Sequence, residues 1–200
     1  MRDKILEKAA DMFLSLGFKS VTMDDIASEM GVSKKTIYAH FQNKTTLVKE
    51  VTNFMFDSVC CGLDLIHEQE KNPIVELFEI KKFLMSVLKD EKSSPQYQLQ
   101  KYYPKIYDEI KTKQFEFMQN SIKENLQRGL EQQLFRNTID EEFIARIYFY
   151  GMVAIKDHEL FPVTMFTKNE LLDKYLEYHL RGICTPKGIE EIEKQLKEIK

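Results

Sequence analysis

Two short helical patterns joined by a tight turn restrict the fold of this 200-residue chain more than any other feature. The first pattern follows Thr22, a good N-cap residue, and acids stand in its first turn, where the helix dipole favours them. The turn, residues 30–33, contains Gly31 and ends on Ser33, which can cap the next helix. Such a turn before a capped helix is typical of a helix-turn-helix. The spacing predicts that unit within residues 22–44.

The rest of the chain also carries helical patterns. Glycine (7) and proline (5) are scarce, and the 43% hydrophobic and 30% charged residues are typical of a soluble globular protein. Apolar residues recur at helical spacing over residues 2–16, and Asn43 can cap a longer helix. No segment shows the alternation of a strand. The chain is therefore predicted to be all-α, with a three-helix N-terminal helix-turn-helix domain before a larger helical domain.

Beyond residue 66 the helical patterns become longer. A break before Pro73 opens one helix, and Pro104 suits the first turn of another. The expected helices cover about 73–88, 105–129, 140–160 and 167–182, with a polar loop at 90–95 and a short segment at 97–103. The tail carries apolar residues at 3-4-3 spacing, which favours a short amphipathic helix packed on the body over a coiled coil.

Composition and motif searches narrow the function. The net charge of −3 does not exclude DNA binding, because only the surface on the phosphates must be basic. No run of about 18 apolar residues and no signal-peptide pattern occurs, and three cysteines make no disulfide framework, so a cytoplasmic protein is expected. The histidines are scattered, and no nucleotide-binding, hydrolase or zinc motif is present. We therefore expect no catalytic residues, no metal and no cofactor.

The second helix of the expected helix-turn-helix has two unlike faces. Ile37 and Phe41 form an apolar inner face. Its outer face mixes cations, a hydroxyl, an aromatic ring and a methyl group, which can contact phosphates, base edges and thymine methyls. Ser33 and the free N–H groups at the helix start can bind a phosphate. The alternative, a merely solvated face, does not explain why turn, cap and inner face occur together with these cations.

At this point the chain resembles the DNA-binding domain of the tetracycline-repressor (TetR) family. The resemblance covers about residues 2–50. It rests on Ile5-Leu6, Ala9-Ala10, Phe13, Gly17-Phe18, Thr22-Met23-Asp24-Asp25-Ile26-Ala27, Gly31-Val32-Ser33, Thr36-Ile37-Tyr38-Ala39-His40-Phe41, Asn43-Lys44 and Leu47. Thr45-Thr46 stand where the family commonly carries an acid, a change that an exposed first turn tolerates.

The resemblance implies a role for each matching residue. The positions that usually hold the DNA backbone are Ser33, Tyr38, His40 and Lys44. The positions where base edges are read are Lys34, Lys35, Thr36 and Ala39. Thr22, at the start of the preceding helix, is expected at a phosphate. The implied domains are residues 1–46 for DNA binding and 47–200 for dimerisation and ligand binding.

The resemblance also implies a ligand-responsive repressor that binds a palindromic operator in double-stranded DNA as a homodimer. The dimer would form through the last two long helices, which carry more large apolar residues than a peripheral helix needs. A small-molecule effector would bind between the long helices. Candidate pocket residues, for which core or interface packing is the alternative, are Tyr102, Tyr103, Phe115, Met118, Tyr148, Met152 and His158.

Two other classes of function stay open on the sequence. A helical enzyme or a ligand-binding module without DNA would need a catalytic cluster, and none is visible. A protein-interaction adaptor that has lost DNA binding is disfavoured by the intact cations and tyrosine of the outer face. Cys60 and Cys61 could form a redox switch, but adjacent helical cysteines cannot pair without distortion, which favours packing.

Overall fold

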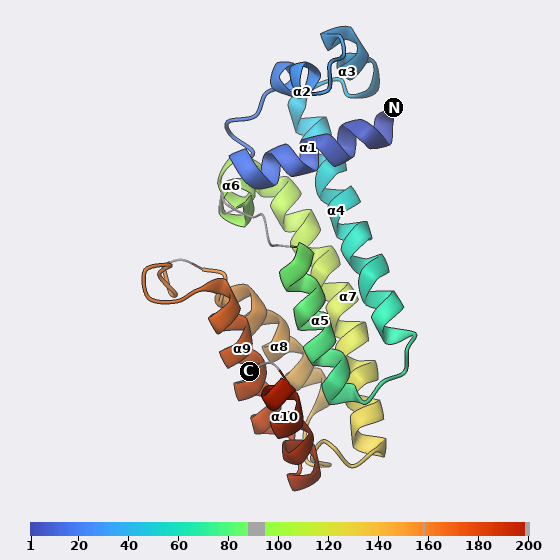
Figure 1. Cartoon of the computed structure of the whole chain (residues 1–200), viewed down its shortest axis with the longest axis vertical. Coiled ribbons are helices and arrows are strands. Elements are labelled where there is room, and N and C mark those ends of the chain that lie inside the picture. Colours follow the sequence, from blue (N-terminus) through green and yellow to red (C-terminus); the bar gives the residue numbers. More distant parts are fainter. Residues whose placement is uncertain (88–94, 158, 199–200) are drawn as a thin grey trace. The chain divides into compact units, whose positions relative to one another are not determined.

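A computed structural model describes residues 1–87, 95–157 and 159–198, and within them the chain is helical with no strand (Figure 1). The helices are α1 (Arg2–Leu16), α2 (Met23–Glu29), α3 (Lys34–His40), α4 (Lys44–His67), α5 (Pro73–Val87), α6 (Pro95–Tyr102), α7 (Pro104–Glu131), α8 (Glu141–Ala154), α9 (Lys168–Ile183) and α10 (Pro186–Glu198). The prediction of an all-α chain with an N-terminal helix-turn-helix is confirmed.

Caps and prolines set most helix ends where the sequence predicted them. Thr167 caps α9 with a reciprocal hydrogen-bond pair to Glu170, and Asp140 caps α8 through the backbone N–H of Phe143 at 3.0 Å. Helix α8 ends at Ala154, earlier than the expected residue 160, because the chain turns there with 3₁₀-type hydrogen bonds. The segment at 97–103 is largely the helix α6, whereas most of the expected loop at 90–95 lies outside the described residues.

The chain forms two compact units, each built from two stretches of sequence. The first comprises Met1–Gly62 and Ser86–Gln114, and the second comprises Leu63–Met85 and Phe115–Lys200. The two units are defined by packing within the chain. The boundary expected at residue 46 instead divides the chain by expected function. Helix α4 therefore starts beside the helix-turn-helix and ends in the second unit.

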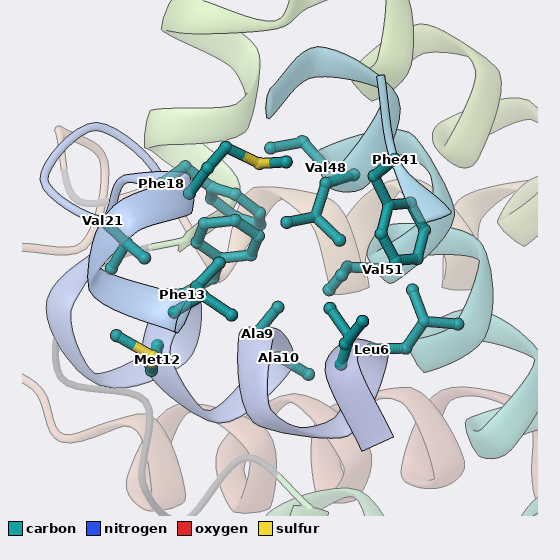
Figure 2. Packing of buried hydrophobic residues seen from close by; sticks show 14 of the residues in the cluster. Leu6, Ala9, Ala10, Met12, Phe13, Phe18, Val21, Phe41, Val48 and Val51 are labelled. Atoms are coloured by element: carbon teal, nitrogen blue, oxygen red, sulfur yellow. The ribbon is translucent and has the colours of Figure 1, made fainter. Parts of the chain in front are cut away.

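The core of the first unit holds the helix-turn-helix on α1 and the start of α4. Figure 2 shows Phe13 and Phe18 at its centre, with ring centroids 4.9 Å apart, and Val48 of α4 near them. Leu99 of α6 and Ile106 of α7 belong to the same buried cluster. Helices α2 and α3 thus rest on a core to which distant parts of the sequence contribute.

A glycine allows one close contact in this unit. Gly17 ends α1 with φ 89°, a conformation that favours glycine. A Cβ built there would lie 2.4 Å from the side-chain nitrogen of Gln98 in α6. The Gln98 carbonyl oxygen accepts a hydrogen bond from the Lys19 backbone N–H at 3.1 Å. Gly17 therefore lets α6 dock against the end of α1.

The second unit has its own core, formed by α5, α8, α9, α10 and the C-terminal half of α7. Helix α10 packs on it through Ile192, which is fully buried, as expected of an amphipathic tail helix. Helix α10 begins at Pro186, which suits the first turn of a helix. In the described part of the chain, no helix is long and apolar enough to cross a membrane.

Candidate nucleic-acid interface

The recognition helix α3 is positioned by two caps and a turn. The Thr22 hydroxyl accepts a hydrogen bond from the Asp25 N–H at 3.1 Å, and the Asp25 carboxylate accepts one from the Thr22 N–H at 2.8 Å. The hydrogen bonds from Thr22 lower the pKa of Asp25. Ser33 caps α3 through the Thr36 N–H at 3.2 Å, and Gly31 adopts φ 64° in the turn. These local bonds fix where α3 begins.

The two faces of α3 are as different as the sequence predicted. Ile37 is its buried residue, with no exposed surface, and Phe41 at its C-cap is 1% exposed. Tyr38 is 49% exposed, although tyrosine usually buries its ring. The other exposed members of the predicted set are Thr22, Ser33, Lys34, Lys35, Ala39 and His40, whereas Thr36 and Lys44 are partly buried. The fold thus presents one continuous outer face of α3 to solvent.

The ion pair of Lys34 is a feature that the sequence argument missed. Its Nζ lies 2.5 Å from the Oδ2 of Asp24 in α2, and this hydrogen bond raises the pKa of Lys34. Ten positions separate the two residues, so only the bend of the helix-turn-helix brings them together. To contact a base edge, Lys34 would have to leave this carboxylate.

Lys44, at the start of α4, is held by a backbone contact. Its Nζ donates to the Lys19 carbonyl at 3.2 Å, and partial burial lowers the pKa of Lys44. Its ammonium is therefore fixed on the first unit close to the end of α1. A cation held in this way loses little side-chain freedom when it meets a phosphate.

Six of the seven candidate pocket residues are described by the structure, and they are divided between the two units. Tyr102 and Tyr103 lie in the first unit, where Tyr103 packs against the core near Phe18. In the second unit, Phe115 packs edge-on against Phe149, and Met118 packs on the core. Tyr148 and Met152 line a cavity of about 10 Å³ between α5, α8 and α9. The seventh candidate, His158, lies outside the described residues.

Within the described ranges, no three histidine, cysteine, aspartate or glutamate side chains gather as metal ligands would.

This geometry agrees with comparisons to known proteins. The family model for bacterial regulatory proteins of the tetR family matches residues 5–51. The HTH-type transcriptional repressor KstR2 of Mycolicibacterium smegmatis is 28% identical over 195 residues, covering 94% of this chain and 92% of that protein. Over residues 5–51 the chain is therefore similar to the tetR family, and along most of its length it is similar to a helix-turn-helix transcriptional repressor.

Two further likenesses cover different parts of the chain. The biofilm operon icaADBC negative regulator IcaR of Staphylococcus aureus is 33% identical over 57 residues, which are 28% of this chain and 31% of that protein. The structure of the ketosteroid transcriptional regulator KstR2 of Mycobacterium tuberculosis has a TM-score of 0.57 and 21% identity, over 92% of this chain and 95% of that one. The latter shows a shared fold along almost the whole chain.

Proposed function

We propose that the protein is a ligand-responsive repressor that binds a palindromic operator as a homodimer in the cytoplasm. The observation that carries the proposal is the exposed outer face of α3 on a capped helix-turn-helix. Residues 1–46 would bind DNA, and residues 47–200 would dimerise and bind the effector. Repression follows if the bound dimer occludes a promoter, and both named relatives are repressors or negative regulators.

Each exposed residue of the interface has a proposed partner on the DNA. The proposed phosphate contacts are Thr22, Ser33, Tyr38, His40 and Lys44, and the proposed base contacts are Lys34, Lys35, Thr36 and Ala39. Phosphate contacts supply affinity, which falls with salt, and base contacts supply sequence preference. A single domain makes too small an interface for tight binding, so two copies are needed on two half-sites.

Exposed apolar side chains support a dimer through α8 and α9. Phe143, Ile147 and Tyr150 are spaced four and three residues apart on α8, and they are 58%, 49% and 55% exposed. Tyr178 of α9 is 78% exposed. Contiguous exposed apolar groups on packed helices are costly in water and mark a surface for a partner. The self-complementary partner of a symmetric dimer is the same pair of helices in a second copy.

The DNA-binding proposal is tested with DNA from upstream of the protein's own gene. Binding is titrated against salt for the wild type and for Tyr38→Ala. Tight, footprintable binding that weakens with salt and is lost in the variant supports the proposal. Weak binding that is alike in both proteins and on unrelated DNA contradicts this operator assignment and favours a protein-interaction adaptor.

The dimer proposal has its own test by analytical ultracentrifugation. Ile147→Asp and Tyr178→Asp are expected to shift a micromolar sample from dimer to monomer, because each places a charge in the proposed interface. Leu65→Asp on α4, also at an exposed apolar residue (59%), is the matched control and should stay dimeric. A wild-type monomer at this concentration, or a dimer unaffected by both variants, contradicts the assignment.

A further inference from the structure

The second unit encloses a lysine beside an apolar cavity. Lys81 of α5 has a 9% exposed side chain and lines the cavity between α5, α8 and α9. Burying an ammonium is costly unless an anion pairs with it. We propose that the effector is an amphipathic anion, whose carboxylate pairs with Lys81 while its apolar body lies in this cavity. The inference rests on the proposed function and names the chemical class of its effector.

The side chains that line the cavity are the reason for proposing a ligand with an apolar body. Leu84 of α5, Met152 of α8 and Leu172 of α9 contribute aliphatic and thioether surface, and Lys81 is the charged residue among the lining side chains. Such a wall attracts a hydrocarbon body and discriminates against a polar one. One cation at the wall then selects the sign of the ligand's charge.

The present partner of Lys81 is suited to exchange. Lys81 pairs with Asp173 of α9, whose side chain is 45% exposed. If Asp173 leaves, its carboxylate turns into water and stays solvated. If Lys81 loses an anion, the ammonium is left buried next to the Phe78 ring, whose centroid is 5.7 Å from Nζ. A ligand carboxylate can therefore replace Asp173 while the buried cation stays paired.

The size of the cavity shows that binding must open it. At about 10 Å³ it admits a water-sized group, whereas drug-sized ligands occupy about 300–1,000 Å³. Met152 is an adaptable wall residue because its unbranched chain has three rotatable bonds. Release of Asp173 frees α9 from its ion pair with α5. A ligand that prefers this opened arrangement shifts the population of the protein towards it.

The experiment is calorimetric titration of the full-length protein with decanoate and with cholate, a linear and a fused-ring carboxylate. Decan-1-ol and decyltrimethylammonium are the uncharged and cationic controls. We expect at least one carboxylate to bind and both controls to bind more weakly. Lys81→Met should weaken carboxylate binding about 10- to 100-fold, the range expected for a hydrogen bond to a charged group. Lys82→Met, at an exposed neighbour, should leave it unchanged.

The Asp173→Asn variant should change the affinity for carboxylates in the opposite direction. It removes the carboxylate that competes for Lys81, so it should tighten carboxylate binding, and this result does not depend on how well Lys81→Met folds. Lys81→Arg, which keeps the cation, should retain binding. The proposal is overturned if neither carboxylate binds, if decanol binds as well as decanoate, or if Lys81→Met binds like the folded wild type.

Operator binding by the same samples distinguishes a failure of the effector proposal from a failure of the proposed function. A protein that binds its operator but no carboxylate overturns the effector class and leaves the proposed function in place. A protein that binds a carboxylate through Lys81 but no operator overturns the proposed function and supports the assignment of the cavity.

Discussion

Adjacent residues of α3 allow stability and DNA recognition to be perturbed separately. Ile37 has no exposed surface, whereas Tyr38 is 49% exposed. Truncating a buried isoleucine to alanine costs about 2–5 kcal/mol, through lost transfer energy and a cavity. A surface substitution usually changes stability by less than about 0.5 kcal/mol. We therefore expect Ile37→Ala to lower the free energy of unfolding by about 2–5 kcal/mol and Tyr38→Ala to leave it nearly unchanged.

The assay pairs urea unfolding, followed by circular dichroism, with operator binding, followed by fluorescence anisotropy. Tyr38→Ala should lose operator affinity at unchanged stability. Ile37→Val, which removes one methylene, should cost about 0.5–1.5 kcal/mol and fall between wild type and Ile37→Ala. Because single domains are stable by only about 5–15 kcal/mol, the alanine variant should also unfold locally at lower urea.

A specific result would refute this reasoning. If Tyr38→Ala destabilised the protein as much as Ile37→Ala, the ring would be part of the core, and the outer face of α3 would not be a free surface. Equal operator affinity of Tyr38→Ala and wild type, at equal stability, would remove Tyr38 from the interface. Either outcome can be measured without knowing the effector.

Three further predictions concern the second unit and the cysteines. Glu76→Ala should cost about 3–5 kcal/mol in urea unfolding, because it leaves the Arg128 guanidinium without its buried carboxylate, and a loss below about 1 kcal/mol would contradict this. Burial lowers the pKa of His179 to about 4 from 6.5. As the pH falls, His179 is therefore protonated in the unfolded chain before it is protonated in the folded protein. The free energy of unfolding should fall by up to about 3 kcal/mol as the pH drops from 6.5 to 4. His179→Phe should flatten that part of the pH profile, and parallel profiles would refute it. Burial raises the pKa of the Cys184 thiol to about 12, so iodoacetamide at pH 8 should label exposed Cys61 rapidly and Cys184 only in urea; mass spectrometry after digestion would reveal the opposite order.

The features that the sequence predicted well are local ones. The caps at Thr22, Ser33 and Thr167 each need a hydroxyl and a backbone N–H three residues later, so a short window of sequence contains the whole interaction. The buried side of α3 follows in the same way from helical periodicity. Fold class and recognition helix could therefore be predicted without a structure.

The features that the sequence did not predict depend on packing between distant segments. The packing of Tyr103 on the core of the first unit is one such feature, because an apolar helix face does not specify which core it joins. The ion pair between Lys34 and Asp24 was not predicted for a related reason, because it joins two helices across the turn between them. Periodicity identifies which side of a helix is buried, and only the fold identifies its neighbours.

Two buried charges on α5 show how the surroundings of a group separate a structural role from a binding role. Glu76 is 2% exposed and has several partners at once: the Arg128 guanidinium, the Asn125 amide at 2.8 Å and the His67 ring at 3.6 Å. Removing any one of them leaves a buried charge or amide unpaired, so this cluster resists exchange. Lys81, five residues further along α5, is buried to a similar degree but pairs with a half-exposed aspartate beside a cavity. An incoming anion can replace that aspartate without exposing a new buried charge, which is why we assign ligand recognition to Lys81 and structural cohesion to Glu76.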